Sequence, residues 1–242
     1  MITVVVPTYN EEKNIEGCLT ALTKQSIPRD AYEIIVVDGN SKDRTTEIAA
    51  KYADKVIQQV SHGVGGARND GAMAAKGEIV ATTDADCLPD EDWLEIILND
   101  FKDERMVAVT GYLDPMIPKE MHILESGAYK CGFKIANGLR WAGSKVGYYH
   151  LCGANTAFRR DAFIRINGYS DLAYSDDVEI AKRLGPHGKM ALNKRIQVDY
   201  SIRRIQKLGL AKYTWMIMKN DFNVIFLGKK PTKGNYAKQE YN

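Results

Sequence analysis

The sequence predicts an α/β fold in which a mostly parallel sheet is flanked by helices. Over the first 114 residues, short runs of β-branched and apolar residues alternate with segments whose apolar residues recur at helical spacing. Parallel strands are buried on both faces and therefore read as continuous apolar runs, and each crossover between them usually contains a helix. With 242 residues and 45% apolar content, the chain can bury a sizeable core.

The predicted elements follow one another in strict alternation. Strands are expected at residues 2–7, 33–38, 55–60, 78–83 and 106–114, and helices at 15–22, 43–52, 66–76 and 90–101. Asn10 precedes the first helix as a candidate N-cap. Ligands of such sheets bind beyond the carboxyl ends of the strands, so we expect the polar residues that follow the strands to meet at one rim.

The alternation stops near residue 114. Residues 115–151 are rich in Gly, Tyr and Lys, and we expect helical pieces and a mobile loop there. Further strands are predicted at 154–160 and 196–204, with helices at 176–184 and 206–227. No repeat or Pro/Ser-rich linker divides the chain, so we expect one domain spanning residues 1–242.

Charge and cysteine content exclude several classes of protein. Thirty-three basic and 31 acidic side chains leave a net charge of +2, which gives no global field for nucleic acid. The four cysteines form no C-x-x-C pair, which argues against a zinc knuckle and fits a reduced cytoplasmic compartment. The apolar N-terminal run is too short for a signal peptide or a bilayer span of ~20 residues. We therefore expect a soluble protein, or one that is peripheral on a membrane.

An acidic segment directly follows the strand predicted at 78–83. Asp84 and Asp86 are two residues apart, so in an extended segment both side chains can approach one hard cation. Mg²⁺ or Mn²⁺ would take its remaining ligands from water and a substrate diphosphate. A solvated turn with capping aspartates explains the spacing about equally well. We assign Asp90 and Asp92 to the first turn of the following helix, where negative charge is favoured.

Four motifs, in this order and spacing, resemble the family 2 glycosyltransferases of the GT-A fold. They are Pro7-Thr8-Tyr9-Asn10-Glu11, Val37-Asp38-Gly39-Asn40-Ser41-Lys42-Asp43, Gly66-Ala67-Arg68-Asn69-Asp70-Gly71 and Thr83-Asp84-Ala85-Asp86. The resemblance covers almost the whole chain and implies an inverting transferase that uses a nucleotide sugar and a divalent metal. It also implies that residues 1–114 bind the donor and that residues 115–242 form the acceptor-binding half.

The resemblance assigns roles at the donor site. Asp38 would face the base, Glu11 or Asp84 the ribose, and Arg68 would lie against the nucleotide as a fork donor. Asp84 and Asp86 would be the metal ligands. The implied nucleotide-sugar-binding residues are Pro7, Thr8, Tyr9, Glu11, Asp38, Arg68, Asp84, Ala85 and Asp86. A cap at the strand end for Asp38 and a surface position for Arg68 are the alternatives.

The family usually has Glu-Asp at the position of Asp176-Asp177, so Asp177 matches the pattern and Asp176 replaces the Glu. The resemblance implies that Asp177 takes the proton from an acceptor hydroxyl, with Asp176 as a shorter helper. An acidic helix N-terminus is the alternative. Further residues that the resemblance places near the acceptor, the donor sugar or the leaving diphosphate are Gly153, Ala154, Asn155, Arg203 and Arg204. A tight strand entry is the alternative for residues 153–155.

The implied reaction is one in-line displacement at the anomeric carbon. A UDP-sugar is the favoured donor and a GDP-sugar is possible, while the acceptor is a sugar or a lipid-linked compound. The chain lacks the Gln-x-x-Arg-Trp segment of processive relatives, which argues against polymer synthesis. A nucleotidyltransferase and a non-catalytic binding module are rival classes. The first would normally carry a basic Gly-rich loop where this chain has the acidic PTYNEE.

Membrane contact is a further alternative. The predicted C-terminal helix carries Trp215, Phe222 and Phe226 among lysines and is either an amphipathic surface helix or a core-covering one. The surface reading would favour a polyprenyl phosphate acceptor.

Overall fold

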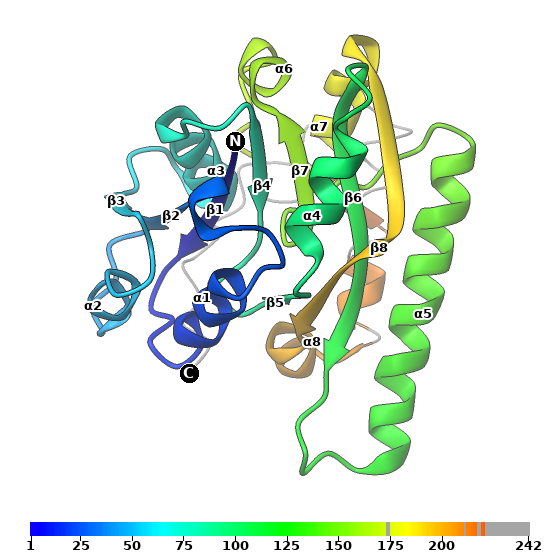
Figure 1. The fold of residues 1–242 in the computed structure, drawn as a ribbon. Helices are drawn as coiled ribbons and strands as arrows, with labels where there is room; N and C mark the ends of the chain where they lie inside the picture. The colour runs from blue at the N-terminus through cyan, green and yellow to red at the C-terminus, as the bar shows by residue number, and fades with distance from the viewer. Residues whose placement is uncertain (173–174, 211, 217–218, 221–242) are drawn as a thin grey trace.

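The computed structural model describes residues 1–172, 175–210, 212–216 and 219–220. An eight-stranded sheet, with the strand order β3-β2-β1-β4-β7-β6-β8-β5, forms its centre (Figure 1). Four of the strand pairings are parallel and three are antiparallel. The α/β class and the mostly parallel sheet predicted from the sequence are confirmed.

The N-terminal strands form a parallel group around β1. Their bounds are β1 (Ile2–Thr8), β2 (Tyr32–Asp38), β3 (Lys55–Gln58) and β4 (Ile79–Thr82). β1 pairs in parallel with β2 and β4, and β2 pairs in parallel with β3. Every residue of β1, β2 and β4 is buried, as expected for strands that are covered on both faces.

Two hydrophobic clusters cover the two faces of this sheet. One contains residues of α1 (Ile15–Thr23) and α4 (Trp93–Asp100), and α2 (Thr45–Ala49) also contributes to it. The other contains residues of α3 (Gly63–Ala74), α6 (Arg160–Arg165) and α7 (Asp176–Leu184). Successive residues of β1 alternate between them, with Val4 and Val6 in the first cluster and Val5 in the second.

The antiparallel strand β7 (Thr156–Arg159) joins the two halves of the sheet. It lies between β4 and β6 (Met106–Met116), and β6 pairs in parallel with β8 (Lys189–Ser201). The short β5 (Leu88–Pro89) pairs with β8 at the sheet edge. Thr82 at the end of β4 pairs with Thr156 at the start of β7, which brings the turn before β7 next to the acidic segment after β4.

The C-terminal half corrects three predictions. Residues 123–145 form one helix, α5 (Ile123–Lys145), where helical pieces and a mobile loop were expected. β8 begins at Lys189 rather than at residue 196. The terminal helix predicted at 206–227 is interrupted, because α8 (Arg203–Leu208) ends before Gly209, whose φ of 81° is left-handed. Residues 211, 217–218 and 221–227 of that prediction lie outside the described residues.

Candidate active site

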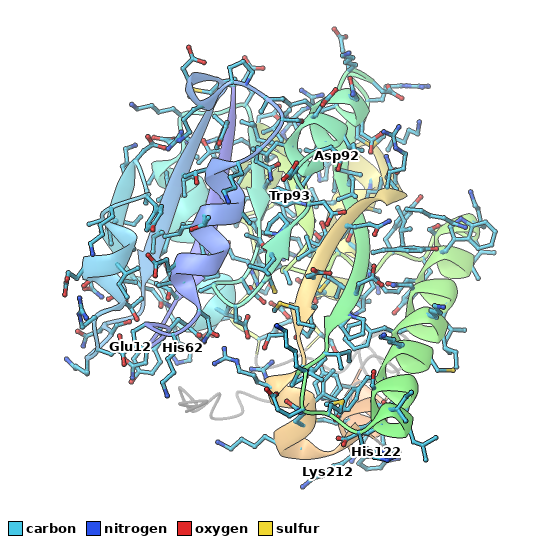
Figure 2. All side chains as sticks on the ribbon, turned by 60° about the horizontal axis from the view of Figure 1, so that its bottom comes forward. Glu12, His62, Asp92, Trp93, His122 and Lys212 are labelled. Carbon is cyan, nitrogen blue, oxygen red and sulfur yellow. The ribbon has the colours of Figure 1, made fainter. Side chains whose placement is uncertain are left out.

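The loops that follow β1 and β2 contact one another at the carboxyl end of the parallel strands. The N–H of Asn10 donates to the Ser41 hydroxyl at 2.9 Å, and the N–H of Glu11 donates to the Thr45 hydroxyl at 2.8 Å. Figure 2 labels Glu12 and His62, in the loops after β1 and β3, toward this end of the molecule. The shared rim that the strand order predicted is therefore present.

The segment after β4 presents a group of three potential ligand atoms. Oxygens of Asp84 and Asp86 and the sulfur of Cys87 lie within 4.8 Å of one another. Cys87 is fully buried, and burial together with the charges of Asp86 and Asp84 raises the pKa of its thiol well above the usual range. The thiol therefore stays protonated, and the two half-buried carboxylates are the donors that suit Mg²⁺ or Mn²⁺.

A guanidinium lies on these carboxylates. Nη2 of Arg203 donates to both carboxylate oxygens of Glu11 at 2.9 Å and to Oδ2 of Asp86 at 2.8 Å. Burial and the charge of Asp86 raise the pKa of Glu11. Arg203 thus joins the loops after β1 and β4, while Arg204 follows it in α8 and is half-buried. Sequence reasoning placed Arg203 near the leaving diphosphate, and it lies at the carboxylates predicted to hold the metal.

Arg68 connects the segment after β4 to the predicted base, Asp177. Its side chain is 6% exposed, and Nη2 donates to Oδ1 of Asp84 at 2.7 Å while Nη1 lies 3.9 Å from Oδ2 of Asp176. The guanidinium carbon also lies 5.6 Å from the centre of the Tyr169 ring. The surface alternative for Arg68 is wrong. In this geometry Arg68 binds protein carboxylates, and its contact with a nucleotide stays a prediction.

Gly153 permits the burial of Arg68. A Cβ atom at Gly153 would lie 2.2 Å from the Arg68 guanidinium carbon, closer than any real contact of that kind. The expected close approach of backbone at this glycine is therefore made to a side chain of the protein.

Asp176 and Asp177 begin α7 beside the turn before β7. The N–H of Gly153 donates to Oδ1 of Asp177 at 3.1 Å, and Nδ1 of His150 lies 3.9 Å from Oδ2 of Asp177. Burial raises the pKa of Asp177 to about 6, and burial together with the charge of Asp177 raises the pKa of Asp176 to about 7. About one fifth of each side chain is exposed, so both carboxyl groups remain within reach of solvent.

The side-chain amide of Asn155 makes all its hydrogen bonds with other groups of the protein. Its Nδ2 donates to the carbonyl oxygens of Tyr112 and Ile196 at 2.8 and 3.2 Å, and its Oδ1 accepts from Nε1 of Trp93 at 2.8 Å. Both Asn155 and Ala154 are buried. The geometry of Asn155 fits a residue that fixes the turn carrying Gly153, and the position of this turn near an acceptor or donor sugar stays a prediction.

The rim at β1 and β2 contains Asp38 and Thr8, both buried. The Asp38 carboxylate accepts from the N–H groups of Asn40 and Ser41 at 3.0 Å and from the Ser41 hydroxyl at 2.5 Å. Asp38 is thus the turn cap considered from the sequence, although a carboxylate can accept about four hydrogen bonds. The Thr8 hydroxyl has no hydrogen-bond partner within the described part of the chain, which leaves a polar atom available to a ligand.

One residue near the predicted base, Arg140, carried no signal in the sequence. Nη2 of Arg140, from α5, donates to the Thr110 hydroxyl at 3.0 Å and to the carbonyl of His150 at 3.2 Å, and burial lowers the pKa of its guanidinium. Arg140 therefore holds the backbone of the segment that contains His150. It lies 30 residues from Thr110 in the chain, so no local pattern could indicate the contact.

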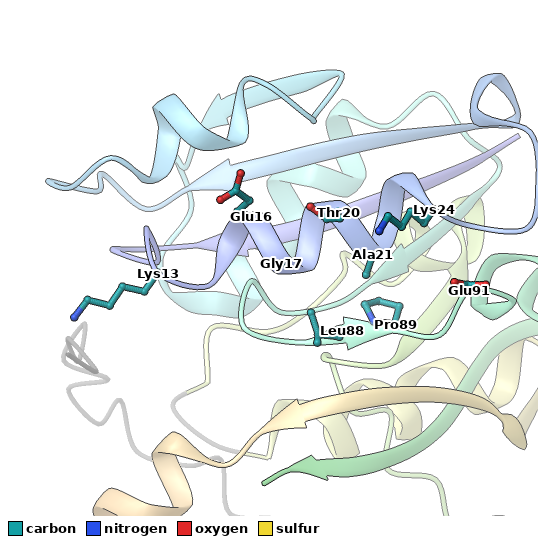
Figure 3. A pocket seen from close by; sticks show the side chains of 9 residues that line it. All are labelled: Lys13, Glu16, Gly17, Thr20, Ala21, Lys24, Leu88, Pro89 and Glu91. Carbon is teal, nitrogen blue, oxygen red and sulfur yellow. The ribbon is translucent and has the colours of Figure 1, made fainter. Parts of the chain in front are cut away.

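An open groove of about 540 Å³ lies between α1 and β5 (Figure 3). Its nine lining residues include none of the site residues described above. They are Lys13, Glu16, Gly17, Thr20, Ala21, Lys24, Leu88, Pro89 and Glu91. The groove is separate from the chemistry of the candidate site.

Comparison with known proteins identifies relatives of the chain. A family model described as Glycosyl transferase family 2 matches residues 3–166. The glycosyltransferase AglE of Haloferax volcanii is 40% identical over 100 residues, which cover 39% of this chain and 33% of AglE. This chain therefore matches only about a third of the length of that curated relative.

Two solved structures share the fold. The mannosyltransferase PcManGT of Pyrobaculum calidifontis, in complex with GDP-Man and Mn²⁺, gives a TM-score of 0.67 at 26% identity over 95% of this chain and 65% of that one. TarS of S. aureus, in complex with UDP-GlcNAc, gives a TM-score of 0.64 at 21% identity over 83% of this chain and 58% of that one. Both likenesses support the GT-A fold for this chain.

Proposed function

Because the chain belongs to glycosyl transferase family 2, a family of glycosyltransferase enzymes, we propose that it transfers a sugar from a nucleoside-diphosphate sugar to an acceptor hydroxyl with inversion. Asp177 is the observation that carries the proposal. A carboxyl with a pKa of about 6 is ionised at neutral pH and is a stronger base than an ordinary aspartate. The Gly153 N–H fixes one of its oxygens and leaves the other for the acceptor proton.

A divalent cation fits the same proposal. Asp84 and Asp86 would hold Mg²⁺ or Mn²⁺, and the cation, when bound, would neutralise charge on the departing diphosphate. Arg68 keeps Asp84 oriented through its 2.7 Å ion pair. Arg203 already bridges Glu11 and Asp86, and we infer that it turns to the diphosphate oxygens when the carboxylates bind the cation.

The nucleoside would lie against the loops after β1 and β2. The buried Thr8 hydroxyl and the remaining acceptor capacity of Asp38 are the protein groups proposed to meet it. Pro7, Tyr9 and Glu11 complete that loop. We propose a UDP-sugar as the first donor to test and a GDP-sugar as the second, since the structural neighbours bind UDP-GlcNAc and GDP-Man.

Membership of the family favours glycosyl transfer over nucleotidyl transfer. The polyprenyl phosphate alternative differs from the proposal in one chemical respect, because a phosphate with a second pKa near ~6 is already ionised and scarcely needs a base. The turnover of the Asp177→Asn variant therefore distinguishes the two acceptors.

The proposed function is tested by following slow hydrolysis of UDP-glucose, UDP-GlcNAc and GDP-mannose, with water as the acceptor, by proton NMR. The proposal expects one donor to be consumed and the first sugar released to have the opposite anomeric configuration to the donor. Release of the same configuration would contradict the single displacement. Asp92→Asn is the matched control for Asp177→Asn, because Asp92 precedes α4 and makes no side-chain cap hydrogen bond.

A further inference from the structure

The helix α5 exposes an unusually apolar outer surface. Of its 23 residues only Tyr129 and Asn137 are buried, and Figure 1 shows the helix along the edge of the molecule beside β8 and β6. Ile123, Leu124 and Leu139 are 80%, 77% and 69% exposed. Monomeric soluble proteins seldom expose a large continuous apolar patch without a binding role.

The exposed apolar residues form one continuous stripe. They recur at three- and four-residue spacing, which places them on one face of a helix. The stripe consists of Leu124, Ala128, Cys131, Ile135, Leu139, Ala142 and Val146, and each of these is exposed. At 1.5 Å per residue the helix is roughly 34 Å long, so the stripe extends along most of one side of the molecule.

A basic flank borders this stripe. The helix contains four basic residues against a single acid, Glu125. Lys130, Lys134 and Lys145 are exposed and lie along the same side of the stripe as Trp141. The Trp141 ring, 37% exposed, has Nζ of Lys194 at 4.0 Å and Nζ of Lys145 at 5.3 Å from its centre. Apolar residues beside lysines and a Trp are typical of helices that lie in the plane of a membrane surface.

We propose that α5 docks the protein on the surface of an anionic lipid bilayer, with the apolar stripe in the acyl boundary and the lysine flank at the headgroups. No helix in the described ranges is long and apolar enough to cross a membrane. A second copy of the chain fits less well, because antiparallel pairing of two α5 stripes would bring the two lysine flanks together.

The inner face of the same helix contacts the candidate site. Asn137 binds the backbone of Leu113, and Arg140 binds Thr110 and the carbonyl of His150, which lies beside Asp177. Docking through α5 would therefore place the acceptor side of the site at the membrane surface. The inference concerns binding alone and does not depend on the proposed reaction. Membrane contact through the C-terminal helix stays a separate prediction, and much of that segment lies outside the described residues.

The test is co-sedimentation of the full chain with vesicles of phosphatidylcholine alone and of phosphatidylcholine with phosphatidylglycerol. We expect binding to the anionic vesicles only, weakened by salt. The double variant Ile135→Gln/Leu139→Gln is expected to lose about tenfold or more in affinity. Lys130→Gln/Lys134→Gln is expected to lose roughly fivefold per lysine. The matched control is Val60→Gln/Met73→Gln, which changes two apolar residues that are 90% and 62% exposed elsewhere.

Three results would overturn the proposal. The wild-type chain could fail to bind anionic vesicles, or the Ile135→Gln/Leu139→Gln variant could bind them as tightly as wild type. The third result combines two observations: wild type binds no vesicles, and it forms a dimer in sedimentation velocity that the Ile135→Gln/Leu139→Gln substitutions dissociate. This result would assign the stripe to self-association. Circular dichroism of each variant establishes that it is folded, as expected for substitutions at exposed positions.

Discussion

Asp177→Asn is expected to stabilise the folded protein at neutral pH and to remove most of its activity. Burial raises the pKa of Asp177 from 3.8 to about 6, and one pKa unit corresponds to about 1.4 kcal/mol. Ionising this carboxyl therefore costs the folded state up to about 3 kcal/mol. Because one fifth of the side chain is exposed, we expect a gain of about 1–2 kcal/mol in the variant.

The direction of this stability change follows from the protons that Asp177 binds in the folded and the unfolded state. Between about pH 4 and about pH 6 the folded protein holds the Asp177 proton more tightly than the unfolded chain, so the free energy of unfolding falls as the pH rises. Asn binds no proton and lacks this contribution. The advantage of the variant should therefore be present at pH 8 and mostly lost near pH 4, where the carboxyl is protonated in the folded protein and still about half protonated in the unfolded chain.

The assay is urea denaturation of wild type, Asp177→Asn and Asp92→Asn at both pH values, together with turnover of the preferred donor. Loss of a general base typically lowers the rate ~10²–10⁴-fold. Equal stability of Asp177→Asn and wild type at pH 8 would refute the argument from burial. Near-full turnover of the folded variant would refute the hydroxyl acceptor and favour a phosphate acceptor.

Three further predictions concern the same site. Gly153→Ala should lower the stability of the fold by ~1–3 kcal/mol in a thermal melt, because the added Cβ would meet the Arg68 guanidinium. Its control, Gly138→Ala, has open space at the Cβ position and should stabilise α5 slightly. Equal stability changes in the two variants would refute this packing. In the absence of nucleotide, the Arg203→Met variant should bind Mn²⁺ roughly tenfold more tightly than wild type, because the Arg203 guanidinium no longer competes with the cation for Asp86. Arg204→Met is the control and should bind Mn²⁺ like wild type. Electron paramagnetic resonance measures both affinities, and an unchanged affinity of Arg203→Met would contradict this competition. Turnover should rise with pH through about 6, the pKa of Asp177, and level off above about pH 7, where the carboxyl is almost fully ionised. A rate that is flat from pH 4 to pH 8 would exclude Asp177 as the base.

The N-terminal half of the fold was predictable because its signal is local. Every residue of β1 and β2 is buried, so each strand appears in the sequence as a continuous apolar run. α5 was not predictable in the same way. It contains glycines at 127, 132, 138 and 143, which weaken helix propensity, and its apolar stripe faces outward, so its sequence gave no core-facing helical pattern.

The candidate site was predictable as a set of residues and not as a set of contacts. The resemblance to the family pointed to Asp84, Asp86 and Asp177. The structure places Asp84 and Asp177 near the Arg68 guanidinium and pairs Asp86 with Arg203. The pairing of Arg203 with Glu11 joins residues 192 positions apart in the chain, and only the tertiary fold sets it. For the same reason the sequence could not indicate that the Asn155 amide is satisfied by the protein.

We propose that the segment after β4 binds a cation and, through it, the diphosphate of a nucleotide sugar. The decisive experiment is calorimetric titration of UDP and GDP, with and without Mn²⁺, on wild type and Asp86→Ala. One nucleotide is expected to bind, to require Mn²⁺ and to lose its affinity in the variant. Absence of binding to folded wild-type protein, or binding that the variant retains in full, would refute a cation and diphosphate site at Asp84 and Asp86.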